Sequence, residues 1–105
     1  MVKIITEAEF EKEVLESDRL VVVDFFANWC MPCKALSPVL DKLAIEFEGS
    51  VTIVKIDTEQ SGATARQYGI RSIPAMLFFK DGEVVDKVIG NVPKIELQEK
   101  ISSWI

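Results

Sequence analysis

The two cysteines of this chain, Cys30 and Cys33, are separated only by Met31 and Pro32. A thiolate is a strong nucleophile, and two thiols at this spacing can alternate between a dithiol and a disulfide. The run 20–27 before them is apolar apart from one acid, which predicts a buried strand, and a helical pattern follows them. A Cys-x-x-Cys motif between a strand and a helix indicates thiol–disulfide chemistry.

The place of each cysteine along the predicted helix gives the two sulfurs different roles. Unpaired N–H groups and the positive end of the helix dipole stabilise an anion at a helix N-terminus, where Cys30 is expected. We therefore expect Cys30, nearer to solvent, to attack a disulfide of a partner protein and form a mixed disulfide. Cys33, one turn further and more buried, would then attack Cys30 and release the reduced partner. Pro32 is tolerated in the first turn of a helix, and Met31 offers apolar contact to a substrate.

Asp24 is the second residue that could take part in this chemistry. A lone carboxylate within an apolar strand is expected to be desolvated, and desolvation raises the pKa of an acid. A pKa near neutrality suits a group that accepts the proton of Cys33, directly or through a water. The alternative is a structural carboxylate that caps nearby backbone groups. We favour proton transfer, because burying an acid costs stability without an evident structural return.

Other interpretations of the cysteines are two ordinary core residues, a structural bridge or a metal site. Their place between strand and helix, with Trp29 and Lys34 on either side, disfavours the first two. A zinc site usually needs four ligands, and the chain has no histidine and no third cysteine. We predict no metal and no cofactor beyond the Cys30–Cys33 pair. A metal held between two subunits, and a structural or holdase subunit that uses only an apolar groove, stay open as alternatives.

The chain has 105 residues and a formal net charge of −5, and 49% of its residues are apolar. This length and apolar content predict one folded domain over residues 1–105. An acidic chain without a long basic run is not expected to bind nucleic acid or an anionic membrane. The first residues show no apolar targeting segment, so we predict no signal peptide. Two cysteines are too few for a secreted disulfide framework, which predicts a reducing cytoplasmic location. An acidic chain with little unexplained apolar surface is expected to be a monomer.

Strand-like and helical patterns alternate along the chain in the order β-α-β-α-β-α-β-β-α. The predicted strands cover residues 3–5, 20–27, 51–57, 75–79 and 84–89. The predicted helices begin after Thr6, which with Glu9 fits a capping box, span about 33–47 and 63–68, and begin again at Pro93. Strands joined through helices are expected to be parallel, which predicts an α/β fold with a mixed central sheet and helices on both faces.

Three shorter signals refine this prediction. Pro38 lies inside the second predicted helix, where it removes a backbone donor and should produce a kink. Asp81-Gly82 is a typical hairpin turn and makes the last two strands antiparallel. Pro74, just before the strand at 75–79, suits a tight turn, and its spacing alone favours a cis or a trans bond about equally.

Several of these motifs, in this order, resemble the thioredoxin family over essentially the whole chain. The resemblance rests on residues 23–34, Pro38, 68–74, 79–83 and Gly90. It implies a thioredoxin fold with a five-stranded sheet in the order 1-3-2-4-5 and four flanking helices. It also implies a protein-disulfide reductase that maintains cell redox homeostasis and carries electrons from a thioredoxin reductase to disulfide-containing client proteins. An oxidase or isomerase on the same fold is the neighbouring hypothesis.

The resemblance also implies residue roles at the matching positions. Cys30 matches the attacking cysteine, Cys33 the resolving one, Asp24 the buried proton-transfer acid and Pro74 a cis-proline that packs opposite the disulfide. The residues implied to border an apolar groove for an extended substrate segment are Trp29, Ile73, Pro74, Gly90 and Asn91. In that groove the backbone of Ile73 would pair with the substrate.

The chain departs from the family pattern at three positions. Met31 replaces the usual glycine between the cysteines, which could shift the redox potential and the range of partners. Phe26 stands at a position where family members often have tryptophan, so one apolar aromatic residue replaces another. Many members have a lysine near the buried acid, and the aligned position here is read as Ile53. Lys55, two residues further on the same face of its strand, is the candidate to replace that lysine. Without it, the pKa of Asp24 should be higher still.

Overall fold

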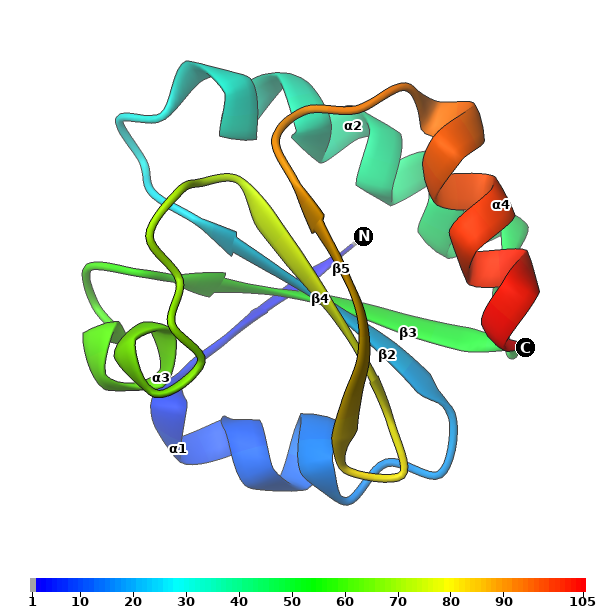
Figure 1. Ribbon diagram of the computed structural model, residues 1–105, viewed down its shortest axis with the longest axis horizontal. Helices are drawn as coiled ribbons and strands as arrows, with labels where there is room; N and C mark the ends of the chain where they lie inside the picture. The colour runs from blue at the N-terminus through cyan, green and yellow to red at the C-terminus, as the bar shows by residue number, and fades with distance from the viewer. Residues whose placement is uncertain (1) are drawn as a thin grey trace.

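The computed structural model describes residues 2–105, which form five strands and four helices around one sheet (Figure 1). The strands are β1 (Lys3–Ile5), β2 (Leu20–Phe26), β3 (Val51–Asp57), β4 (Ala75–Lys80) and β5 (Glu83–Ile89). The helices are α1 (Glu7–Phe10), which continues as a π-helical segment η1 (Glu11–Leu15), α2 (Met31–Glu46), α3 (Gly62–Gln67) and α4 (Lys94–Trp104). No helix within residues 2–105 is long and apolar enough to cross a membrane.

The sheet has the strand order β1-β3-β2-β4-β5, as expected. β1 and β2 both run parallel to β3, whereas β4 is antiparallel to β2 and to β5. The central strand β2 is buried along its whole length, as predicted from its continuous apolar run. The carboxyl end of β2 leads directly into the Cys-x-x-Cys segment, so the best-covered strand of the sheet positions the cysteines.

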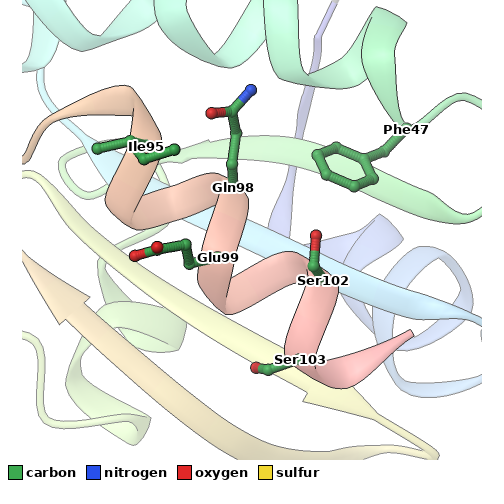
Figure 2. Close-up of a pocket in the computed structure, with 6 residues that line it drawn as sticks. All are labelled: Phe47, Ile95, Gln98, Glu99, Ser102 and Ser103. Carbon is green, nitrogen blue, oxygen red and sulfur yellow. The ribbon is translucent and has the colours of Figure 1, made fainter.

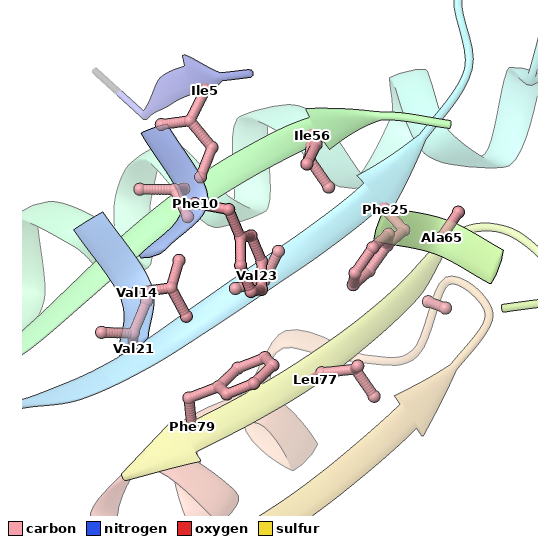
Figure 3. Packing of buried hydrophobic residues seen from close by; sticks show 12 residues of the cluster. Ile5, Phe10, Val14, Val21, Val23, Phe25, Ile56, Ala65, Leu77 and Phe79 are labelled. Atoms are coloured by element: carbon pink, nitrogen blue, oxygen red, sulfur yellow. The ribbon is translucent and has the colours of Figure 1, made fainter. Parts of the chain in front are cut away.

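Alternating side chains of the sheet supply two apolar clusters, one on each face. Phe10 and Val14 from α1 and η1, together with Ala65 from α3, cover one face, as Figure 3 shows for this cluster. On the other face, α2 and α4 pack their buried leucines and Ile101 against β2, β3 and β4. Val21, Val23 and Phe25 belong to the first face, so the intervening Asp24 points toward the α2 side.

α2 begins at Met31, two residues earlier than the predicted start at Cys33. The reason is that Cys30 takes the N-cap position, where its sulfur accepts a hydrogen bond from the backbone N–H of Cys33. Pro32 lies in the first turn, where the helix needs no backbone donor. The helix continues through Pro38 and ends at Glu46, one residue before the expected end.

The remaining element ends agree with the prediction to within one residue. β2 ends at Phe26, before Ala27, and α3 runs from Gly62 to Gln67 instead of 63–68. β4 and β5 each extend by one residue toward the turn between them, and α4 starts at Lys94 with Pro93 as its N-cap. The capping box at the start of α1 is confirmed, because the N–H of Thr6 donates to Glu9 Oε1 at 3.0 Å.

Candidate active site

Cys30 and Cys33 form a disulfide at the N-terminus of α2, with 5.3 Å between their Cα atoms. The backbone N–H of Cys33 points at Cys30 Sγ, and the N–S distance is 3.2 Å. The N–H of Cys30 in turn donates to the carbonyl of Ala27 at 3.1 Å, which fixes the turn between β2 and α2. One sulfur of the pair is therefore held against a free amide of the first helical turn, where negative charge is favoured.

The two cysteines differ little in exposure in this disulfide form. We expected Cys30 to lie nearer to solvent, and its exposed fraction is 4% against 2% for Cys33. Both pack in a small apolar cluster with Phe26 and Ala27, against which Ile73 also packs. The sulfurs thus lie just beneath the surface, and the residues around them decide what can approach.

Asp24 is fully buried, and neither of its carboxylate oxygens has a hydrogen-bond partner among the described residues. Burial raises the pKa of this carboxyl from its ordinary 3.8 to about 7, and the charge of Lys55 lowers it in part. The alternative of a structural carboxylate that caps backbone groups is wrong, because Asp24 accepts no bond from any described backbone group. An acid that titrates near neutrality is one that can take and return a proton.

Lys55 is the lysine that faces the buried acid. The register of β2 with β3 pairs Asp24 directly with Lys55, whereas Ile53 lies opposite Val22 and packs in the core. The ammonium of Lys55 donates to Ser37 Oγ at 2.9 Å and lies 4.7 Å from the centre of the Phe26 ring. The strand register therefore places Lys55, not Ile53, at the position near the buried acid where many family members have a lysine.

The Ile73-Pro74 bond is cis. Gly90 donates its N–H to the carbonyl of Pro74 at 2.7 Å, so the end of β5 lies against the proline. Ile73 packs on the cluster that holds the two sulfurs, and Asn91 next to Gly90 is exposed. The structure thus places Ile73 against the disulfide cluster and joins Gly90 to Pro74, next to Ile73.

Trp29 and Met31, which flank Cys30, are among the most exposed apolar residues, with exposed fractions of 66% and 69%. The indole Nε1–H of Trp29 donates to Glu59 Oε2 at 2.7 Å. Sequence reasoning missed Glu59, which lies in a polar connection between β3 and α3 without a local pattern to mark it. The hydrogen bond with Glu59 holds the Nε1 edge of the Trp29 indole, which is otherwise largely exposed.

A pocket of about 250 Å³ opens beside Cys33 on the α2 side of the sheet. Its walls are Ile4, Phe26, Ala27, Asn28, Cys33, Lys34, Ser37 and Lys55. Because Lys55 faces Asp24 and Cys33 lines the same space, the pocket connects the surface with the neighbourhood of the disulfide and of Lys55. Such a space is large enough for water molecules.

A second hollow, of about 590 Å³, lies at the opposite end of α2 (Figure 2). Its walls are Phe47, Ile95, Gln98, Glu99, Ser102 and Ser103. α2 has 16 residues and is therefore about 24 Å long, which separates this hollow from the disulfide at the helix start. The walls carry no cysteine, so this hollow does not belong to the site.

Within residues 2–105, no group of three or more histidine, cysteine, aspartate or glutamate side chains is arranged to hold a metal ion. The chemistry available at the site is that of two sulfurs, one buried carboxyl and the lysine beside it.

Comparison with known proteins gives the same assignment as this geometry. The family model described as Thioredoxin matches residues 1–103. The chain belongs to the thioredoxin family. It is 48% identical to a thioredoxin of Porphyra purpurea over 101 residues, which cover 96% of this chain and 94% of that protein. It is 50% identical to thioredoxin 1 of Synechococcus elongatus with the same coverage of both chains.

Family membership and the site together establish the fold and the kind of activity. The sheet order and the four helices are those of the thioredoxin fold. The Cys30–Cys33 disulfide is the redox-active group of the family's Trp-Cys-x-Pro-Cys motif, with Met31 at the variable position. The protein is a disulfide oxidoreductase with the role of a protein-disulfide reductase.

Proposed function

We propose that the protein reduces disulfides of client proteins with Cys30 as nucleophile and Cys33 as resolving cysteine. The observation that carries this assignment is the N–H of Cys33, which points at Cys30 Sγ from the first turn of α2. A hydrogen bond from a helix N-terminus favours a thiolate over a thiol. Only Cys30 has this position, because Cys33 lies three residues inside the N-cap.

The reaction consists of two exchanges with balanced electrons. The Cys30 thiolate attacks one sulfur of the client disulfide, whose S–S bond breaks, and the other client sulfur leaves as a thiolate that takes up a proton. Cys33 then loses its proton and attacks Cys30 Sγ, which breaks the mixed disulfide and releases the second client thiol. The client gains two electrons and two protons, and the Cys30–Cys33 pair is oxidised to the observed disulfide.

Asp24 is proposed to accept the proton that Cys33 gives up in the second exchange. A carboxyl with a pKa of about 7 is partly ionised at neutral pH and can act in both directions of the reaction. The pocket that Cys33 and Lys55 line gives water a path toward this region, so a water can relay the proton. Lys55 is a positioning residue that keeps part of the Asp24 population ionised.

The client is proposed to bind across an apolar surface around Cys30. Trp29 and Met31 supply exposed apolar contact on one side of the sulfurs, and Ile73 with the cis Pro74 supplies the other. Gly90 and Asn91 form the border of this surface. An extended segment of a client would pair there with the backbone of Ile73.

The proposed setting is a monomer in a reducing cytoplasm, where the protein carries electrons and maintains redox homeostasis. A thioredoxin reductase is proposed to restore the dithiol, because the sequence contains no nucleotide-binding fingerprint of its own. The net charge of −5 supports docking on basic surfaces of partners and disfavours nucleic acid and anionic membranes.

The test is reduction of insulin disulfides by dithiothreitol with the wild type, with Cys30→Ser and without protein. We expect the wild type to accelerate the reaction and Cys30→Ser to behave like the buffer. If a folded wild type gave no acceleration, general reductase activity would be wrong. The dithiol metal site between subunits and the holdase role would then be the hypotheses to examine, by metal content and by the function of a Cys30→Ser/Cys33→Ser variant.

A further inference from the structure

Met31 is an exposed thioether placed between two reactive sulfurs. It opens α2 directly after Cys30, and 69% of its surface is exposed. Met76, on the central part of the sheet, has an exposed fraction of 0%, and Met1 lies outside the described residues. A reagent in solution can therefore reach the side chain of Met31, the residue next to Cys30, and cannot reach that of Met76.

The order in which these sulfurs oxidise follows from their chemistry. A thiolate reacts with a hydroperoxide before a thioether does, so the reduced protein first forms the Cys30–Cys33 disulfide. That disulfide contains no thiolate, and the next exposed divalent sulfur at the site is the thioether of Met31. A thioether reacts with peroxide to form methionine sulfoxide, which is polar and chiral.

We propose that Met31 is a modification site, at which a hydroperoxide forms methionine sulfoxide once the Cys30–Cys33 disulfide is present and thereby weakens client binding. A lone pair of the Met31 sulfur attacks one peroxide oxygen and the O–O bond breaks. That oxygen stays on sulfur, and the other leaves as water or as an alcohol after taking up a proton. The thioether loses two electrons and the peroxide gains them.

The consequence for client binding rests on the proposed function, in which Met31 offers apolar contact. Phe26, Ala27 and Ile73 make the surroundings of the two sulfurs apolar. A sulfoxide oxygen at the rim of such a surface must keep its water or lose a hydrogen bond when a client segment covers it. Binding should weaken, whereas the exchange between sulfurs should keep its rate, because Cys30 and its bond from the N–H of Cys33 are unchanged.

The experiment treats the disulfide form with hydrogen peroxide, removes the peroxide and maps the peptides by mass spectrometry. We expect one added oxygen on the peptide with Met31 and much less on the peptide with Met76. In the insulin assay, KM for the protein disulfide should rise about threefold to tenfold with little change in kcat. Incubation with both methionine sulfoxide reductases and dithiothreitol should remove the oxygen and restore KM.

Two variants provide matched controls. Met31→Leu keeps an apolar side chain without a thioether, so peroxide should leave its KM at the value measured for this variant before treatment. Met76→Leu removes the buried thioether by a volume-conserving exchange, so peroxide should raise its KM as in the wild type. This comparison separates Met31 from oxidation at Trp29 and Met1, which both variants retain.

Three results would overturn the proposal: no added oxygen on Met31, a sulfoxide at Met31 without a rise in KM, or an equal rise in Met31→Leu. Failure of the proposed function gives a different result, because the untreated wild type would then not accelerate insulin reduction at all. Peptide mapping would still decide in that case whether Met31 is the oxidised methionine.

Discussion

Asp24, which faces Lys55, is the carboxyl of the site whose pKa is raised to about 7. The carboxyl is buried without a hydrogen-bond partner among the described residues, and Lys55 faces it from the next strand. The pKa rise comes from burial, and the lysine charge opposes it. A carboxyl kept near its ordinary pKa by full pairing would be ionised throughout the neutral range and would be a poor proton acceptor.

The first prediction concerns Asp24→Asn. A raised folded pKa means that the folded state binds more protons than the unfolded state, so the free energy of unfolding falls as pH rises from about 4 to about 7. The rise of the Asp24 pKa from 3.8 to about 7 means that the protein is about 4 kcal/mol less stable at pH 8 than it is at a pH where Asp24 is protonated in both the folded and the unfolded state. Since the new amide is itself buried, we expect Asp24→Asn to gain about 1 to 3 kcal/mol at pH 8, measured by denaturant unfolding.

The same substitution should slow resolution of the mixed disulfide at neutral pH, measured by stopped-flow exchange with a disulfide peptide. Asp57→Asn is the control, because Asp57 is also buried but its Oδ1 accepts the N–H groups of Glu59 and Gln60. This control should show no gain in stability. An Asp24→Asn protein that is less stable than the wild type and equally fast in exchange would contradict the assignment of Asp24.

The second prediction concerns Lys55→Met. Removal of the positive charge opposite Asp24 leaves burial unopposed, so the pKa of Asp24 should rise above about 7. Titration of the Asp24 carboxyl carbon by NMR measures this directly, and exchange should need a higher pH to reach its full rate. Lys34→Met is a suitable control, because Lys34 lines the same pocket without facing Asp24 in the sheet. Equal titration curves in Lys55→Met and the wild type would show that Lys55 does not act on Asp24.

At the scale of elements, the chemistry depends on where α2 begins and on turns that hold the strands in register. The usual N-cap residues are serine, threonine, aspartate and asparagine, whereas α2 uses the sulfur of Cys30. The β4–β5 turn places Asp81 at φ 52° and Gly82 at φ 80°, which is the left-handed region that a two-residue hairpin requires. That hairpin carries Gly90 to the carbonyl of Pro74.

The third prediction compares Gly82→Ala with Gly69→Ala. Both glycines have positive φ, which costs about 1 to 2 kcal/mol for a residue with a Cβ. A Cβ at Gly82 would also lie 3.1 Å from the carbonyl oxygen of Leu15, whereas a Cβ at Gly69 would meet nothing within 4 Å. We expect thermal or denaturant unfolding to show a loss of about 2 to 3 kcal/mol for Gly82→Ala and about 1 kcal/mol for Gly69→Ala. The reverse order would show that the contact with Leu15 is unimportant.

At the scale of the whole molecule, one sheet covered on both faces brings together residues from four parts of the sequence. Much of this arrangement could be predicted. The continuous apolar run of β2 indicated a central strand. β3, Val51–Asp57, has the predicted bounds because its buried apolar residues Val51, Ile53, Val54 and Ile56 end just before Asp57 and the polar connection that follows. The sheet order came from the family resemblance, since local patterns do not determine which strands pair.

What could not be predicted depends on contacts between distant segments. Local spacing does not decide between cis and trans at Pro74, and only the family resemblance indicated the cis bond that the structure has. The pairing of Lys55 with Asp24 depends on strand register, in which a shift of two residues would place Ile53 there instead. Glu59 could not be assigned to Trp29 because the two are 30 residues apart and both lie in exposed segments. The start of α2 at Met31, before Cys33, could not be predicted either, because it depends on the sulfur of Cys30 acting as the N-cap.

The most direct test of the central claim is to ask which sulfur forms the mixed disulfide. Reduced Cys30→Ser and Cys33→Ser proteins would each be mixed with insulin or a disulfide peptide, and the adducts measured over time by intact mass and peptide mapping. We predict that Cys33→Ser rapidly accumulates an adduct on Cys30, because the attack proceeds and resolution is blocked. Cys30→Ser should form little adduct over the same time. Equal or faster adduct formation on Cys33 would contradict the assignment of Cys30 as the nucleophile.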